Sequence, residues 1–169
     1  MPGLICAHTH FYGVFSRGMA IPGAPAADFI EILKKLWWRL DESLLAEDIY
    51  YSAMVSLIDA IKHGTTTVFD HHASPRHIAN SLDIIEKAVI DTGIRTSICY
   101  EVTDRGGIEK TRAGIDENLR MINKLKNSTN GSLVKPMFGL HAGLTLSDDT
   151  LKLCRSLIPE GYGFHVHVA

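Results

Sequence analysis

Short apolar runs alternate with amphipathic segments along the chain, and this alternation restricts the possible folds more than any other feature of the sequence. The runs predict β-strands at residues 3–7, 65–70, 94–101, 133–140 and 163–169. Apolar spacing of three and four residues predicts helices at residues 26–40 and 46–63, around 78–89 up to Gly93, around 115–125, and from Ser147 to residue 158. A parallel return between strands needs a crossover, so this order predicts parallel β-α units in an α/β fold.

Two architectures are compatible with such units, a doubly wound sheet and part of a barrel. A dinucleotide-binding sheet carries a G-x-G-x-x-G turn after its first strand, and this chain has no such turn there. The first strand instead runs into histidines. A turn is expected at residues 127–132.

Histidines gather at the ends of the predicted strands. Seven of the nine lie at or just beyond carboxyl ends: His8, His10, His71, His72, His141, His165 and His167. Residues two apart on a strand share a face, so each H-x-H pair presents both imidazoles to one side. Parallel sheets and barrels build their sites at these ends, and imidazole is a ligand of first-row metals. A lone strand-end histidine is more often a hydrogen-bonded structural residue, and we interpret His63 and His77 as surface residues. Of His71 and His72, at most one can point inward.

Residues 2–10, Pro-Gly-Leu-Ile-Cys-Ala-His-Thr-His, resemble the opening motif of the amidohydrolase superfamily. The resemblance continues at Arg17-Gly18 and at residues 64–67, 139–141 and 165–169. One H-x-H is a weak signal, but this ordered series covers essentially the whole chain. It is most similar to the branch that holds cytosine and guanine deaminases, S-adenosylhomocysteine deaminases and triazine chlorohydrolases.

The resemblance implies a partial TIM-type (β/α)8 barrel holding strands 1 to 5, with residues 1–169 as a single domain. It implies one divalent metal ion, zinc or else iron, with His8, His10 and His167 as ligands. His141 would contact the substrate, and Arg17 is a second candidate for substrate binding. Bound metal would lower the pKa of a water molecule and supply a hydroxide nucleophile. The implied enzyme is a hydrolytic deaminase or chlorohydrolase of a small heterocyclic molecule.

The sequence departs from the family pattern at its end. It stops at Ala169, where the fifth-strand H-x-x-E motif would next supply a glutamate for proton transfer. The sixth-strand histidine and the eighth-strand aspartate of the family are also absent. Asp70 and Glu101 lie at strand ends, but neither matches a family catalytic position. We therefore expect the 169-residue chain to be inactive by itself.

Composition narrows the partners and the compartment. Seventeen basic and nineteen acidic residues give a net charge of -2 without a charged block, which predicts no nucleic-acid partner. No apolar run reaches the roughly 18 residues of a membrane helix, and the N-terminus lacks the pattern of a signal peptide. Three scattered cysteines predict no disulfide framework and favour a cytoplasmic protein.

Two other interpretations remain open. The chain could be a non-catalytic half-barrel that dimerises or pairs with a separate C-terminal half, or an incomplete gene product without independent activity. An open half-barrel exposes two edge strands, so we expect self-association unless residues 11–25 or the N-terminal tail cover an edge.

Overall fold

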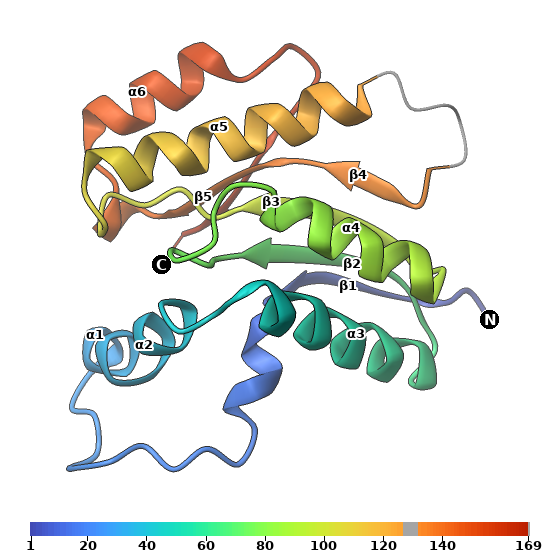
Figure 1. Ribbon diagram of the computed structural model, residues 1–169, viewed down its shortest axis with the longest axis horizontal. Coiled ribbons are helices and arrows are strands. Elements are labelled where there is room, and N and C mark those ends of the chain that lie inside the picture. The colour runs from blue at the N-terminus through green and yellow to red at the C-terminus, as the bar shows by residue number, and fades with distance from the viewer. Residues whose placement is uncertain (127–131, 169) are drawn as a thin grey trace.

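The computed structural model describes residues 1–126 and 132–168, in which parallel strands alternate with helices (Figure 1). The strands are β1 (Leu4–Thr9), β2 (Thr65–His72), β3 (Arg95–Tyr100), β4 (Val134–Pro136), β5 (Phe138–Ala142) and β6 (Phe164–His167). The longer helices are α3 (Ala46–Lys62), α4 (Ser81–Thr92), α5 (Ile108–Leu125) and α6 (Asp148–Leu157). Shorter helical segments are η1 (Phe11–Ser16), α1 (Phe29–Ile32), η2 (Leu33–Trp37), α2 (Trp38–Asp41) and η3 (Gly143–Thr145).

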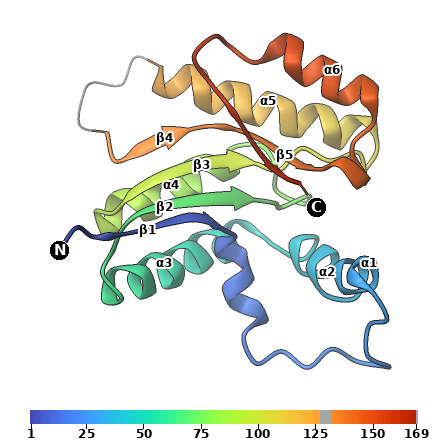
Figure 2. The same cartoon turned by 180° about the vertical axis from the view of Figure 1, so that it is seen from behind.

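The strands are parallel and follow their order in the sequence. One sheet has the order β1-β2-β3-β4, a second pairs β5 with β6, and a bridge between Val102 and Leu140 connects the two. The larger helices follow the outer side of this curved array, and the segment from η1 to α2 projects from the carboxyl end of β1 (Figures 1 and 2). The order confirms the predicted partial barrel, because a doubly wound sheet would place β1 between two other strands.

The strand expected at residues 133–140 is broken at Met137. Its first part, β4, pairs with β3, whereas β5 pairs with β6. The amide of Asn118 on α5 lies between β3 and β5, where its Oδ1 accepts the N–H of Tyr100 (2.9 Å) and of Gly139 (3.2 Å). The strand therefore changes partner at the break, and a helix side chain satisfies the backbone groups there.

The helix expected at residues 26–40 begins later and is not uniform. Asp28 caps it by accepting the N–H of Glu31 (2.8 Å), so that α1 starts at Phe29. A π-helical segment, η2, then separates α1 from α2. This wider segment, Leu33–Trp37, lines the cavity beside the histidine cluster described below through Leu33 and Trp37.

Other elements agree with the expectations to within a few residues. In α3, Ile49, Ala53 and Leu57 form the buried face. Ser147 caps α6 by accepting the N–H of Thr150 (3.2 Å). Both β1 and β2 extend two residues further than predicted, so that His8 and His72 lie within strands. Of the turn expected at residues 127–132, all but residue 132 lies outside the described residues.

Apolar side chains fill the space between strands and helices in two clusters. One joins β1, β2 and β3 to α3, α4 and α5, and the other joins β5 and β6 to α5 and α6. Phe164 packs on Phe138 in the second cluster (ring centroids 5.5 Å apart), which turns the alternate residues His165 and His167 inward. No helix in the described part of the chain has the length and apolar character to cross a membrane.

Candidate metal centre

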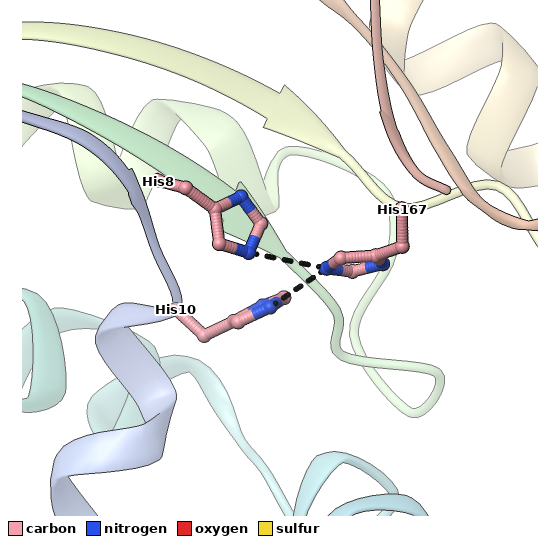
Figure 3. Close-up of side chains that lie close together, drawn as sticks. All are labelled: His8, His10 and His167. Carbon is pink, nitrogen blue, oxygen red and sulfur yellow. Dashed lines mark hydrogen bonds between the residues drawn. The ribbon is translucent and has the colours of Figure 1, made fainter. Parts of the chain in front are cut away.

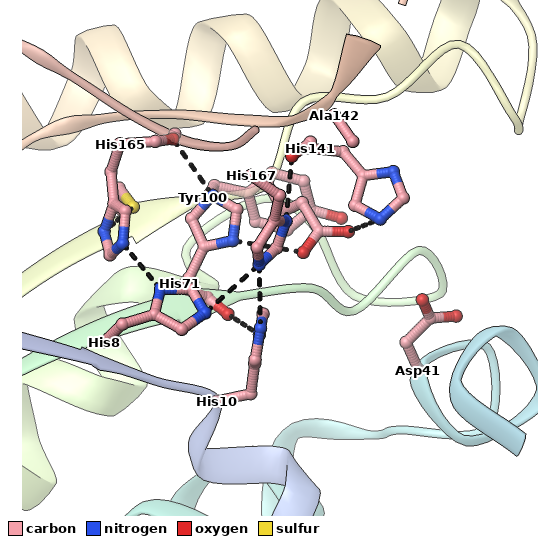
Figure 4. A network of polar contacts seen from close by, with 12 residues as sticks. His8, His10, Asp41, His71, Tyr100, His141, Ala142, His165 and His167 are labelled. Atoms are coloured by element: carbon pink, nitrogen blue, oxygen red, sulfur yellow. Dashed lines mark hydrogen bonds and ion pairs between the residues drawn. The ribbon is translucent and has the colours of Figure 1, made fainter. Parts of the chain in front are cut away.

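Polar side chains from five strands or the residues just after them meet at the carboxyl ends of the array (Figure 4). They are His8 and His10 from β1 and its end, His71 from β2, Glu101 after β3, His141 from β5, and His165 and His167 from β6. Parallel strands bring their carboxyl ends to one rim, so residues far apart in the sequence become neighbours there. The structure thus brings together every strand-end histidine of the sequence except His72.

Three imidazoles point their Nε2 atoms at one another (Figure 3). His167 Nε2 lies 3.1 Å from His10 Nε2 and 3.2 Å from His8 Nε2. Each residue offers one nitrogen within 4.8 Å of the other two. These are the three residues that the resemblance to the amidohydrolase superfamily implies as metal ligands.

Backbone contacts fix the tautomers of two of these rings. His10 Nδ1 donates to the carbonyl oxygen of His71 (2.6 Å), and His167 Nδ1 donates to that of His141 (2.8 Å). A carbonyl oxygen can only accept, so the hydrogen of each neutral ring is on Nδ1 and its lone pair is on Nε2. The short contact between His10 and His167 therefore joins two acceptors.

Two facing lone pairs need a proton or a cation between them. Burial lowers the pKa of His10 to about 3, and burial together with the neighbouring His167 lowers that of His8, so both rings are neutral near pH 7. A divalent cation bound by all three Nε2 atoms would satisfy these lone pairs together. Zinc bound tetrahedrally at about 2.0–2.1 Å from each nitrogen places ligand atoms roughly 3.3 Å apart, close to the separations found here. The three residues fit a divalent metal ion.

Glu101 lies behind this cluster and contacts two further histidines. Its Oε2 is 3.3 Å from His71 Nδ1, and its Oε1 is 3.5 Å from His141 Nε2. His71 donates from Nε2 to the carbonyl oxygen of His165 (3.1 Å), so its Nδ1 carries a lone pair toward the carboxylate. Neither Glu101 Oε2 nor His71 Nδ1 has a hydrogen-bond partner among the described residues. Glu101 also completes two further sets of possible ligands, with His10 and His71 and with His141 and His167.

A cavity of about 390 Å³ opens beside the cluster. It is lined by His10, His141 and His167, by the carboxylates of Asp41 and Glu101, and by apolar side chains that include Phe29, Leu33, Trp37, Trp38 and Leu144. Its wall is held by a buried ion pair between Arg105 and Asp41 (2.6 Å), with Arg105 also stacked over Trp38. Burial outweighs the Arg105 contact and raises the pKa of Asp41 to about 7. Such a mainly apolar space with a few convergent polar groups is typical of a small-molecule site.

Arg17 does not join His141 in this cavity. It lies just after η1, where its Nη2 forms an exposed ion pair with Asp59 of α3 (3.0 Å). It lines a separate cavity of about 390 Å³ on the side of β1 that faces α3. His72 points away from the cluster and contacts Ser74 Oγ (2.9 Å), which agrees with the expectation that only one of His71 and His72 points inward.

The sequence did not assign roles to Glu101, His71, His165 or Asp41. The sequence shows Glu101 as an acidic residue at a strand end. Its contacts, His71 on β2 and His141 on β5, could not be predicted from sequence spacing. Asp41 comes directly after the helix predicted at residues 26–40, and no sequence pattern marked it.

The sequence matches the amidohydrolase family over residues 1–169, which is the whole chain. With the parallel strand order and the cluster of strand-end histidines, this match defines the class of protein. The chain belongs to the amidohydrolase family.

Relatives of this chain include curated deaminases. It is 32% identical over 173 residues to a 5'-deoxyadenosine deaminase of Methanobrevibacter smithii, and the match covers 100% of this chain and 36% of that protein. It is 36% identical over 174 residues to a 5-methylthioadenosine/S-adenosylhomocysteine deaminase of Caldanaerobacter subterraneus subsp. tengcongensis, with the same coverage. The chain thus spans about a third of the length of the relatives it matches.

Solved structures with the same fold include two that contain zinc. An adenosine deaminase from Xanthomonas campestris with bound zinc aligns with a TM-score of 0.79 at 19% identity, over 99% of this chain and 36% of that protein. An atrazine chlorohydrolase from Arthrobacter aurescens, complexed with zinc, aligns with a TM-score of 0.72 at 19% identity, over 99% of this chain and 40% of that protein. At these identities the likeness establishes the fold.

Proposed function

We propose that this chain forms the metal-binding part of a hydrolytic deaminase that acts on a small heterocyclic molecule. The convergence of the three Nε2 atoms, two of them with their lone pairs fixed toward the centre, carries the proposal. His8, His10 and His167 would hold one divalent ion, zinc in preference to iron. Zinc is favoured because the two solved structures described above contain it.

The ion would supply Lewis acidity, which lowers the pKa of a bound water molecule toward neutrality. The chain's own residues hold the centre in shape and form one wall of the substrate cavity. His141, fixed by Thr145 through its Nδ1, turns Nε2 toward Glu101 at the cavity wall, where we propose that it contacts the substrate. Trp37 and Trp38 would cover the face of a flat ring. Because Arg17 is held by Asp59 outside this cavity, the proposal for substrate contact rests on His141.

Cleavage of a C–N bond is favoured over cleavage of a C–Cl bond. The two relatives described above, at 32% and 36% identity, are named deaminases, whereas the chlorohydrolase is similar in fold at 19% identity. Their names point to adenosine-type compounds as the first substrates to test. Three free cysteines suit the reducing cytoplasm that we propose as the compartment.

Proton transfer is the step for which we assign no residue in this chain. A general acid or base contributes about 10²–10⁴-fold to the rate of a hydrolysis. The family's glutamate and aspartate lie at positions beyond Ala169, and Glu101 is enclosed between His71 and His141. We therefore propose that the 169-residue chain alone does not turn over substrate.

Metal analysis of the complete product of the gene tests the proposed function. The purified protein should contain about one zinc per chain and release ammonia from 5'-deoxyadenosine, and a chelator should abolish this activity. His8→Ala, His10→Ala and His167→Ala should each weaken zinc binding more than 100-fold, because loss of a direct ligand costs more than the about 10–100-fold of an outer contact.

His63→Ala is the matched control, because His63 lies at the exposed end of α3, where its Nδ1 contacts Asp59. It should bind zinc as the parent does. Unchanged zinc binding in the three ligand variants would refute the metal centre. A protein that binds zinc normally but forms a stable complex with a separate polypeptide, and is inactive without it, would favour the half-barrel that pairs with a second chain.

A further inference from the structure

His8 differs from the other two converging histidines in what its Nδ1 contacts. His10 and His167 donate to backbone carbonyl oxygens, whose positions the strands fix. His8 Nδ1 instead lies 2.8 Å from Nε2 of another side chain, His165 (Figure 4). The hydrogen of this contact could belong to either ring, so the tautomer of His8 depends on what His165 does with its other nitrogen.

Which ring donates the hydrogen between His8 and His165 follows from a series of contacts that ends on a backbone carbonyl oxygen. Cys99 Sγ lies 3.5 Å from the carbonyl oxygen of Asp70, which can only accept, so the thiol donates to it. His165 Nδ1 lies 3.8 Å from the same sulfur, which leaves the ring to donate its hydrogen to Sγ. The lone pair of His165 is then on Nε2 and accepts the hydrogen of His8 Nδ1. His8 is left with its lone pair on Nε2, facing His167 Nε2 at 3.2 Å.

We propose that His165 is a positioning residue that fixes the tautomer and orientation of His8, and that Cys99 in turn fixes His165. This inference rests on the metal centre proposed above. In metal-binding histidines the N–H of the second ring nitrogen generally donates a hydrogen bond to an outer partner. Loss of that partner costs about 10–100-fold in metal affinity. His165 therefore belongs to the metal centre without being one of its ligands.

The surroundings make His8 more dependent on this partner than its neighbours are on theirs. His8 is exposed on one side, whereas Cys99 is fully buried and held between β2 and β6. Gly139 of β5 brings its backbone against Cys99, where an added Cβ would lie 3.0 Å from the sulfur. The packing of the strands thus fixes the position of Cys99. Through His165, Cys99 in turn fixes the orientation of the exposed ring of His8.

Zinc affinity measured by chelator competition on the complete gene product tests the inference. His165→Phe keeps a ring of similar size but has no acceptor, and it should weaken zinc binding about 10–100-fold. His165→Gln places an amide oxygen near the position of Nε2 and should recover most of the affinity. His165→Asn carries the same amide group on a shorter side chain, which cannot reach His8 Nδ1. Its zinc affinity should stay as low as that of His165→Phe.

A double-mutant cycle separates positioning from a merely structural role. In a His8→Ala background, His165→Phe should change zinc affinity by less than about twofold, because the ring that it positions is gone. The proposal would be overturned if His165→Phe lowered zinc affinity equally in the parent and in the His8→Ala background. It would also be overturned if His165→Phe left zinc affinity unchanged while His8→Ala lowered it. Those outcomes leave the metal centre standing. A parent protein that binds no zinc would overturn the metal centre and this inference together. If His165→Phe does not fold, the comparison of His165→Gln with His165→Asn decides, and equal affinities would count against the proposal.

Discussion

Asp70 is a fully buried carboxyl group at the carboxyl end of β2, next to His71. Its Oδ1 accepts the N–H of Phe11 (2.8 Å), whereas its Oδ2 has no partner among the described residues. Burial raises the pKa of Asp70 from its usual 3.8 to about 8, despite the backbone hydrogen bonds that oppose the shift. Near neutral pH the folded protein therefore keeps a proton that the unfolded chain releases.

This proton makes stability depend on pH in a defined direction. The folded state binds more protons than the unfolded state between about pH 4 and pH 8, so the free energy of unfolding should fall across that window by up to ~1.4 kcal/mol per pH unit. The contribution is complete below about pH 4 and lost above about pH 8. Asp70→Asn keeps the acceptor for Phe11 and removes the titration. Urea unfolding with chelator present should show the variant gaining stability relative to the parent as the pH rises. Parallel pH profiles of the two proteins would contradict this.

At the scale of residues, the sequence predicted which side chains gather and not how they contact one another. The two-residue spacing of His8 with His10 and of His165 with His167 placed each pair on one face, and the structure confirms this. The choice between His71 and His72 depends on how β2 is oriented in the array, which no local pattern reveals. Glu101 and Cys99 contact histidines of other strands, and sequence spacing does not reveal these contacts.

At the scale of elements, the break between β4 and β5 depends on Gly139. An added Cβ there would lie 2.3 Å from the carbonyl oxygen of Tyr100 on β3, a distance that side chains do not tolerate. The close approach lets Asn118 join the backbones of β3 and β5. Gly139 therefore sets where the strand leaves β3 and turns toward β6.

Gly139→Ala should separate β5 from β3 and destabilise the protein by about 1–3 kcal/mol, the usual range for overpacking a well-packed interior. The backbone of Tyr100 cannot move without disturbing β3, so relaxation should relieve little of this cost. Gly163→Ala is the matched control, since its added Cβ has no atom within 4 Å and its φ is not positive. Urea midpoints of both variants measure the effect. Equal midpoints would mean that the contact at Gly139 relaxes freely.

The sequence predicted the type and order of the main elements because apolar periodicity is a local property. It failed where long-range contacts decide. Residues 133–140 form one apolar run in the sequence, but the first part of the run pairs with β3 and the second with β6. The helix predicted at residues 26–40 has regular apolar spacing, yet its N-cap at Asp28 makes it start later and the π-helical segment Leu33–Trp37 interrupts it.

At the scale of the whole molecule, the strand array has two open edges within the described residues. β1 pairs with β2 on one side, and β6 pairs with β5. Leu4 and Ile5 of β1 are 59% and 67% exposed. η1, which follows β1, packs against α3 through Phe11 and Ser56 and leaves these two residues uncovered. Exposed, apolar strand edges of this kind are templates for pairing with another chain.

The 169-residue chain, expressed by itself, should therefore self-associate at micromolar concentration. Ile5→Lys places a charge on the open edge, where lysine discourages strand pairing, and should shift the chain toward monomer. Ile90→Lys is the matched control, because Ile90 is 61% exposed but lies on α4, away from either edge. It adds the same charge and should leave the association unchanged. Sedimentation velocity distinguishes these outcomes. A compact parent monomer near 18.6 kDa would contradict the predicted self-association, and equal effects of the two substitutions would assign the association to net charge instead of to the strand edge.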